Sequence, residues 1–244
     1  MRSPRPLPLP RSLLPRSPRS RSPSPQPKNP LPRPSRPPRP SAPPKRPSNL
    51  ARPIAVAITG GIGAGKSEAL AAFARHGAAT ISSDDIVHRL LHEDDEVHHA
   101  VVDRFGDRVL DPRGEIDRGT LADIVFADRE ALEWLEGLLH PRVVQEYIGW
   151  REQLAEQDDP PAVCATEVPL LYEVGGQDRF DAVVVVTAPP NVRGERTEVA
   201  VEEREPRLLP DSVKVAQADF AYVNDGSLEK LDDFVQAVLR ELTR

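Results

Sequence analysis

Short runs of apolar residues alternate with helical patterns along residues 51–244. Several of the runs are apolar almost throughout, which is typical of central parallel strands that are buried on both faces. Because helical patterns separate them, we predict a three-layer α/β domain with a five-stranded parallel sheet. The five predicted strands are residues 54–59, 79–81, 162–166, 182–187 and 220–223.

The second and third predicted strands are separated by mostly helical sequence, about residues 84–157. This stretch is too long for a single crossover, so we predict a helical insertion that folds over the functional site. A shorter stretch, about residues 191–217, is predicted to form a short lid. Residues 227–244 have the pattern of an amphipathic closing helix, with Ser227 as its N-cap.

Residues 1–50 differ from the rest of the chain in composition. They hold 18 of the 28 prolines and 12 of the 32 lysines and arginines, without any Asp or Glu. Such a segment cannot build an apolar core, so we predict a disordered basic tail. Three interpretations stay open: an arm that touches nucleic acid or anionic surfaces, a transit-like extension, or upstream sequence translated from a misplaced start. Charge alone is weak evidence for the first, so nucleic acid is not an expected partner.

Residues 51–244 form an acidic body with 20 basic and 38 acidic side chains, a net charge near −18. Its apolar runs are far shorter than the roughly 20 residues that a membrane span needs, so no membrane partner is expected. The sole cysteine, Cys164, cannot form an internal disulfide, which suits a reducing compartment. We therefore expect a cytoplasmic protein, and we expect it to be a monomer.

The strongest motif is the run 60–67, which fits the phosphate-binding pattern G-x-x-x-x-G-K-[ST]. A predicted strand precedes it and a predicted helix follows it, so a glycine-rich turn with a chance lysine is the weaker interpretation. Glycines let successive N–H groups point at one anion, Lys66 reaches the outer phosphates, and the Ser67 hydroxyl can bind Mg²⁺. The predicted nucleotide contacts are Gly61, Ile62, Gly63, Ala64, Gly65, Lys66, Ser67 and Glu68.

A carboxylate follows the second predicted strand, at the edge where open α/β sheets bind ligands. Asp84 there can accept the proton of an attacking hydroxyl group. It can also be the N-cap of the next helix, and both roles stay open. Farther along, a charge-rich segment offers metal-ligand residue types, but we predict a solvated helix–loop–helix for His88, His92, Asp94, Asp95, His98 and His99.

Together these residues resemble the dephospho-CoA kinase family, over residues 54–242. The most specific segments are Thr-Gly-Gly-Ile-Gly-x-Gly-Lys-Ser at 59–67, Leu-His-Pro at 139–141 and Val-Pro-Leu-Leu-x-Glu at 168–173. The resemblance implies a fold of the nucleoside-monophosphate-kinase type and ATP-dependent phosphorylation of the ribose 3′-hydroxyl of dephospho-CoA.

The resemblance also implies roles for single residues. Asp84 is the expected base or orienting group for the acceptor hydroxyl, and Asn224 is expected at the nucleotide. Ser67 is expected to bind Mg²⁺, and Glu167, at the end of the third strand, can hold a water of that ion. Glu173 is expected to be a solvated helix residue.

The acceptor pocket is expected to include His140 and Arg142 of the insertion. His140 followed by Pro141 also suits a helix junction, with the proline in the first turn and His140 as the cap. Arg142 can pair with an acceptor phosphate or with a local carboxylate, and the sequence does not choose between them.

The chain departs from the family pattern at three places. Glu68 puts negative charge beside the triphosphate, and Ser82 replaces a frequent aspartate. The lid is shorter than usual, and Arg204, then Arg196, is the predicted catalytic arginine. Two other functions stay open: another small-molecule kinase, or a non-catalytic nucleotide-binding protein whose tail binds RNA.

Overall fold

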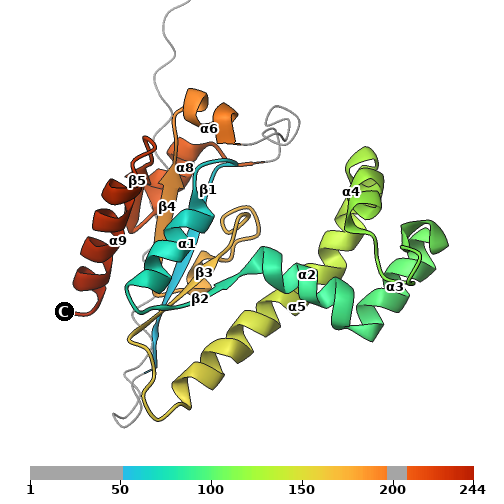
Figure 1. Ribbon diagram of the computed structural model, residues 1–244, viewed down its shortest axis with the longest axis horizontal. Coiled ribbons are helices and arrows are strands. Elements are labelled where there is room, and N and C mark those ends of the chain that lie inside the picture. Colours follow the sequence, from blue (N-terminus) through green and yellow to red (C-terminus); the bar gives the residue numbers. More distant parts are fainter. Residues whose placement is uncertain (1–51, 197–207) are drawn as a thin grey trace, which may run out of the picture. The chain divides into compact units, whose positions relative to one another are not determined.

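Five parallel strands form one sheet in the order β2-β3-β1-β4-β5 (Figure 1). The structure is a computed structural model that describes residues 52–196 and 208–244. The predicted fold class is confirmed, and every predicted strand is found within one residue at either end. The strands are β1 (Ile54–Gly60), β2 (Ala79–Ser82), β3 (Val163–Glu167), β4 (Ala182–Thr187) and β5 (Phe220–Val223).

Successive residues of β1 face opposite layers of the domain. Val56 and Ile58 pack with apolar residues of α1 (Lys66–Arg75) and of the closing helix α9 (Leu228–Leu242). Ala55 and Ala57 belong to a second apolar cluster that includes residues of the helical insertion. The strand is therefore buried on both sides, which explains its nearly continuous apolar sequence. Ser227 caps α9 as predicted, since its side chain accepts a hydrogen bond from the N–H of Lys230 at 3.3 Å.

Four helices form the insertion between β2 and β3. Figure 1 shows α2 and α5 running away from the sheet, with α3 and α4 near their far end. Buried residues of α5, among them Tyr147 and Leu154, continue the apolar cluster on the second face of the sheet. The insertion thus shares one core with the sheet. Its helices are α2 (Ser83–Glu93), α3 (Asp95–Phe105), α4 (Arg118–Ala127) and α5 (Arg129–Ala155), with a 3₁₀ turn at Asp107–Val109.

The predicted helix junction at His140 and Pro141 is wrong. Pro141 lies inside α5, a continuous helix of 27 residues. A proline there removes one helical N–H and crowds the carbonyl group four residues earlier, which belongs to Gly137. The signal for a helix start was local, whereas the buried residues on both sides of Pro141 hold the two halves in one helix.

The lid contributes two described helices, α6 (Pro190–Arg196) and α8 (Asp211–Gln217). The predicted catalytic residue Arg204 lies outside the described residues, as does the predicted tail at 1–50. A second 3₁₀ turn, Gln177–Arg179, precedes β4. Within residues 52–196 and 208–244, no helix has the length and apolar character needed to cross a bilayer.

Candidate active site

The loop between β1 and α1 has the backbone of an anion cradle. Gly63 and Gly65 have φ angles of 70° and 93°, a region that side chains other than glycine rarely adopt. Gly65 is the N-cap of α1, and no side chain caps the helix. The first N–H groups of α1 therefore remain available to an anion, which the helix dipole also attracts.

Two contacts from neighbouring strands fix this loop. A Cβ on Gly60 would lie 1.8 Å from the carbonyl oxygen of Val186 in β4, so only glycine fits there. The buried side-chain amide of Asn224, after β5, donates to the carbonyl oxygen of Ala64 at 2.9 Å. Asn224, predicted at the nucleotide, thus supports the loop that would hold it.

Lys66 lies at the centre of a charged cluster. Its ammonium group donates to the carbonyl oxygen of Gly61 at 3.1 Å. Burial lowers the pKa of Lys66, while the carboxylates of Glu167 and Asp84 raise it in part and nearby Lys214 lowers it further. A bound polyanion would raise the pKa of Lys66 again, because added negative charge favours the protonated form of the lysine.

Ser67 and Glu167 are brought together as a metal site would require. The Ser67 hydroxyl donates to Glu167 Oε1 at 3.4 Å, and Glu167 is only 4% exposed. Burial is the main cause that raises the pKa of Glu167; Lys66 and the hydrogen bond from Ser67 offset part of this effect, and Asp84 and Asp85 add smaller increases. A divalent cation would favour the ionised carboxylate, so the donor set fits Mg²⁺.

The protein supplies few ligands for such an ion. Within the described part of the chain, no group of three or more His, Cys, Asp or Glu side chains could hold a metal. Mg²⁺ usually keeps several waters and binds one or two protein groups together with phosphate oxygens. The pair of Ser67 and Glu167 therefore suits a Mg²⁺ ion that arrives with a nucleotide.

Asp84 does not cap α2. The N-cap is Ser82, whose hydroxyl accepts the N–H of Asp84 at 3.2 Å. The predicted capping role of Asp84 is therefore wrong, because Asp84 is the second residue of the helix. Its exposed carboxylate lies close enough to Lys66 and Glu167 to influence the pKa of both.

Arg193 of α6 lies against the phosphate loop. A Cβ on Gly61 would lie 3.1 Å from Arg193 Nη1, and one on Gly63 would lie 3.1 Å from the Arg193 carbonyl oxygen. The guanidinium group is 3.9 Å from Asp211 of α8. The lid therefore reaches the loop through a residue that sequence reasoning ranked below Arg204 and Arg196.

A buried ion pair anchors the end of the lid and was missed from the sequence. Lys214 of α8 is fully buried, and its ammonium group lies 2.8 Å from Glu173 Oε1. The same oxygen accepts the N–H of Leu209 at 3.0 Å. The expectation that Glu173 is solvated is thus wrong, since its side chain is only 13% exposed. No local sequence pattern predicts this ion pair, because Glu173 and Lys214 lie in segments that are far apart in the sequence.

Other predicted contact residues are engaged within the protein. Glu68 accepts a hydrogen bond from Arg75 at 3.0 Å, so its charge has a partner two turns along α1. Arg142 donates to Glu96 at 3.3 Å and lies 3.9 Å from Asp94, which is the local carboxylate pairing that the sequence left open. His140 is half-buried on α5.

Comparisons with known proteins agree with this geometry. Residues 54–230 match the family model described as dephospho-CoA kinase. Dephospho-CoA kinase of Aquifex aeolicus is 35% identical over 195 residues, which is 78% of this chain and 97% of that protein. The enzyme of Thermobifida fusca is also 35% identical, over 196 residues that make up 78% of this chain and 96% of that one.

Solved structures give the same picture. The crystal structure of TT1252 from Thermus thermophilus has a TM-score of 0.65 and 32% identity, covering 79% of this chain and all of that one. Dephospho-CoA kinase from Campylobacter jejuni has a TM-score of 0.56, covers 79% of this chain and 98% of that one, and at 24% identity shows the fold alone.

Proposed function

The chain belongs to the dephospho-CoA kinase family, and on that basis we propose how its residues phosphorylate the 3′-hydroxyl of dephospho-CoA. The overall reaction converts ATP and dephospho-CoA to ADP and coenzyme A. One observation carries the proposed roles: Lys66, Glu167 and Asp84 interact electrostatically where β1 and β3 end and α2 begins.

The phosphate loop binds the donor. N–H groups at the start of α1 and the ammonium group of Lys66 hold the β- and γ-phosphates of ATP. Ser67 and Glu167 would hold Mg²⁺, which neutralises charge on the phosphate oxygens when it is bound. Arg193 and Arg204 are the lid residues proposed to approach the same phosphates.

Asp84 acts on the acceptor. Its carboxylate accepts the proton of the ribose 3′-hydroxyl as that oxygen bonds to the γ-phosphorus. The bond between the γ-phosphorus and the bridging oxygen breaks, and its electrons leave with ADP. Since Ser82 rather than Asp84 caps α2, the carboxylate of Asp84 is available for this role.

The acceptor's wider environment is proposed to come from the insertion, with His140 and Arg142 as predicted contacts. We further propose that the protein acts as a cytoplasmic monomer. The single buried thiol of Cys164 supports a reducing compartment.

The test combines an assay with a matched pair of variants. Full-length protein, ATP, Mg²⁺ and dephospho-CoA should yield ADP and coenzyme A, identified by mass spectrometry. Asp84→Asn should retain ATP affinity but lose turnover by about 10² or more. Asp85→Asn removes the same charge one residue along α2 and should stay within a few-fold of the parent. Equal losses in both variants would reject Asp84 as the base.

A further inference from the structure

One face of α2 carries a row of polar side chains that starts at the reacting end of the site. Asp84, His88 and His92 are spaced four residues apart, so they lie on the same side of the helix. The buried residues of α2, such as Ile86 and Leu90, lie on a different side. Each step along the row advances about 6 Å, because an α-helix rises about 1.5 Å per residue.

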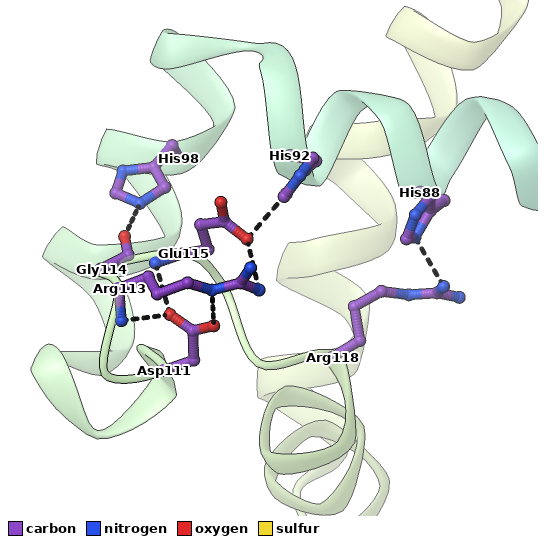
Figure 2. A network of polar contacts seen from close by, with 8 residues as sticks. All are labelled: His88, His92, His98, Asp111, Arg113, Gly114, Glu115 and Arg118. Atoms are coloured by element: carbon purple, nitrogen blue, oxygen red, sulfur yellow. Dashed lines mark hydrogen bonds and ion pairs between the residues drawn. The ribbon is translucent and has the colours of Figure 1, made fainter.

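An arginine from another helix meets this row at His88. Arg118, the first residue of α4, donates from Nη1 to His88 Nδ1 at 2.7 Å (Figure 2). A guanidinium group can only donate, so the acceptor in this hydrogen bond is Nδ1 of His88. Its Nε2–H is then a second donor beside Arg118.

A second ring lies beside the imidazole of His88. His92 stacks on it with ring centroids 6.1 Å apart and an interplanar angle of 16°. His92 Nδ1 in turn lies 3.5 Å from Glu115 Oε2, in the segment before α4. Arg118 is therefore oriented by an imidazole that is itself held in place.

Arg118 differs from its neighbour Arg113 in its partners. Arg113 lies 3.1 Å from both Asp111 and Glu115, so two carboxylates balance its charge (Figure 2). Among residues 52–196 and 208–244, no carboxylate forms an ion pair with Arg118. Arg118 is exposed and keeps its charge without a carboxylate partner, although the body around it has a strongly negative net charge. Such an arginine is suited to an anionic ligand.

The geometry points to a subsite for the acceptor's diphosphate, formed by Arg118 and His88. This inference rests on the proposed function. In dephospho-CoA the 5′-diphosphate and the 3′-hydroxyl are attached to one ribose ring. With the hydroxyl at Asp84, the diphosphate lies about one helical turn along α2, where Arg118 and His88 meet. The guanidinium fork matches phosphate oxygens, and His88 Nε2–H adds a donor.

Two arginines of the insertion would have different roles if this subsite binds the diphosphate. Arg142, predicted from the sequence to contact the acceptor, is engaged with Glu96 and Asp94. Arg118 has no such carboxylate partner among the described residues, and from α4 it contacts His88 of the row that begins at Asp84. The affinity for the acceptor's phosphates is therefore expected to depend on Arg118.

The test compares two acceptors in steady-state kinetics at saturating ATP. Dephospho-CoA carries the diphosphate, and adenosine presents the same 3′-hydroxyl without it. Arg118→Ala should raise KM for dephospho-CoA by about 10- to 100-fold, the loss expected for a hydrogen bond to a charged group. Its kcat and its KM for ATP should change less than about threefold, and KM for adenosine should not change. Arg118→Lys should recover part of the affinity, because it keeps the charge but not the fork.

Arg113→Ala is the matched control, since it removes an arginine of the same segment whose charge is already balanced. It should leave KM for dephospho-CoA within about twofold. An unchanged KM in Arg118→Ala, or an equal increase for both acceptors, would overturn the subsite. A parent protein that does not phosphorylate dephospho-CoA would instead overturn the proposed function. Thermal unfolding of each variant identifies any loss of folding.

Discussion

Two regions of the molecule differ in where their polar groups lie. Around the phosphate loop and its strands polar groups are buried, whereas in the helical insertion they lie near the surface. In the described chain, all the buried polar or charged residues except Ser83, the first residue of α2, lie outside the helices of the insertion: Thr59, Ser82, Thr166, Glu167, Thr187, Lys214 and Asn224. In the insertion, charged side chains pair near the surface, as in Arg89 with Glu146 and Arg104 with Glu130. The proposed donor site is thus built into the core, whereas the proposed acceptor site is built on a surface.

This difference has a physical consequence for the two substrates. Buried groups such as Glu167 and Lys214 cannot reorient without losing their partners, so the donor site is fixed before ATP binds. Exposed pairs contribute little and exchange readily with water. The charged pairs of the insertion can therefore rearrange at small cost in stability, which suits the proposed binding of a long acceptor there.

The sharpest test of the contrast is one substitution made in both regions. Gly60→Ala should abolish folding or lower the free energy of unfolding by more than about 4 kcal/mol. The reason is the φ angle of 146° and the 1.8 Å approach to the Val186 carbonyl oxygen. Gly137→Ala lies in α5, where the added carbon has no atom within 4 Å beyond the neighbouring residues and the backbone of its own helix, and it should instead stabilise by up to about 1 kcal/mol. Urea unfolding measures both, and effects of similar size would remove the contrast.

The buried ion pair of the lid should give the next largest effect. Lys214→Met leaves Glu173 buried without its cation and should lower the free energy of unfolding by about 3–5 kcal/mol. Adding Glu173→Gln should recover part of the loss, because no uncompensated charge remains. A double-mutant cycle in urea measures this coupling. Strictly additive losses would mean that the two side chains do not act as a pair.

The ionised side chain of Glu167 should lower the stability of the folded protein while it serves the proposed reaction. Its folded pKa is raised above the unfolded value, so stability falls as the pH rises from the unfolded pKa through the folded pKa, and the full cost of ionisation is present above the folded pKa. Without nucleotide and Mg²⁺, Glu167→Gln should therefore unfold at a temperature about 2–4 °C higher near pH 8. The difference should vanish below the unfolded pKa, where both forms are neutral. Turnover should fall in the same variant; a lower unfolding temperature at pH 8 would contradict the account.

The smallest effect is expected from an exposed pair of the insertion. Arg89→Ala removes the contact with Glu146. The side chains of Arg89 and Glu146 are 45% and 43% exposed. The free energy of unfolding should change by less than about 1 kcal/mol, with a smaller change at high salt. Urea titrations at two salt concentrations measure it. If Arg89→Ala lowered the free energy of unfolding nearly as much as Lys214→Met does, the charged pairs of the insertion would stabilise the protein as much as the buried pair does.

Sequence patterns located the strands well because their signal is local. β4 is a run of apolar residues buried on both faces, and its predicted bounds agree with those observed. Gly60 to Ser67 likewise forms the cradle that its spacing predicts. Pro141 was misplaced, since a proline that suits a helix start also occurs inside a helix when packing on both sides holds it.

By itself, the amino-acid sequence determined the phosphate loop, the order of strands and helices, and the family. These depend on residues that are neighbours along the chain, so their physics is short-range. The tertiary structure alone decided that Ser82 caps α2, that Glu173 meets Lys214, and that Arg118 joins His88. The last two contacts join segments far apart in sequence, and burial and charge compensation select them only once the chain has folded.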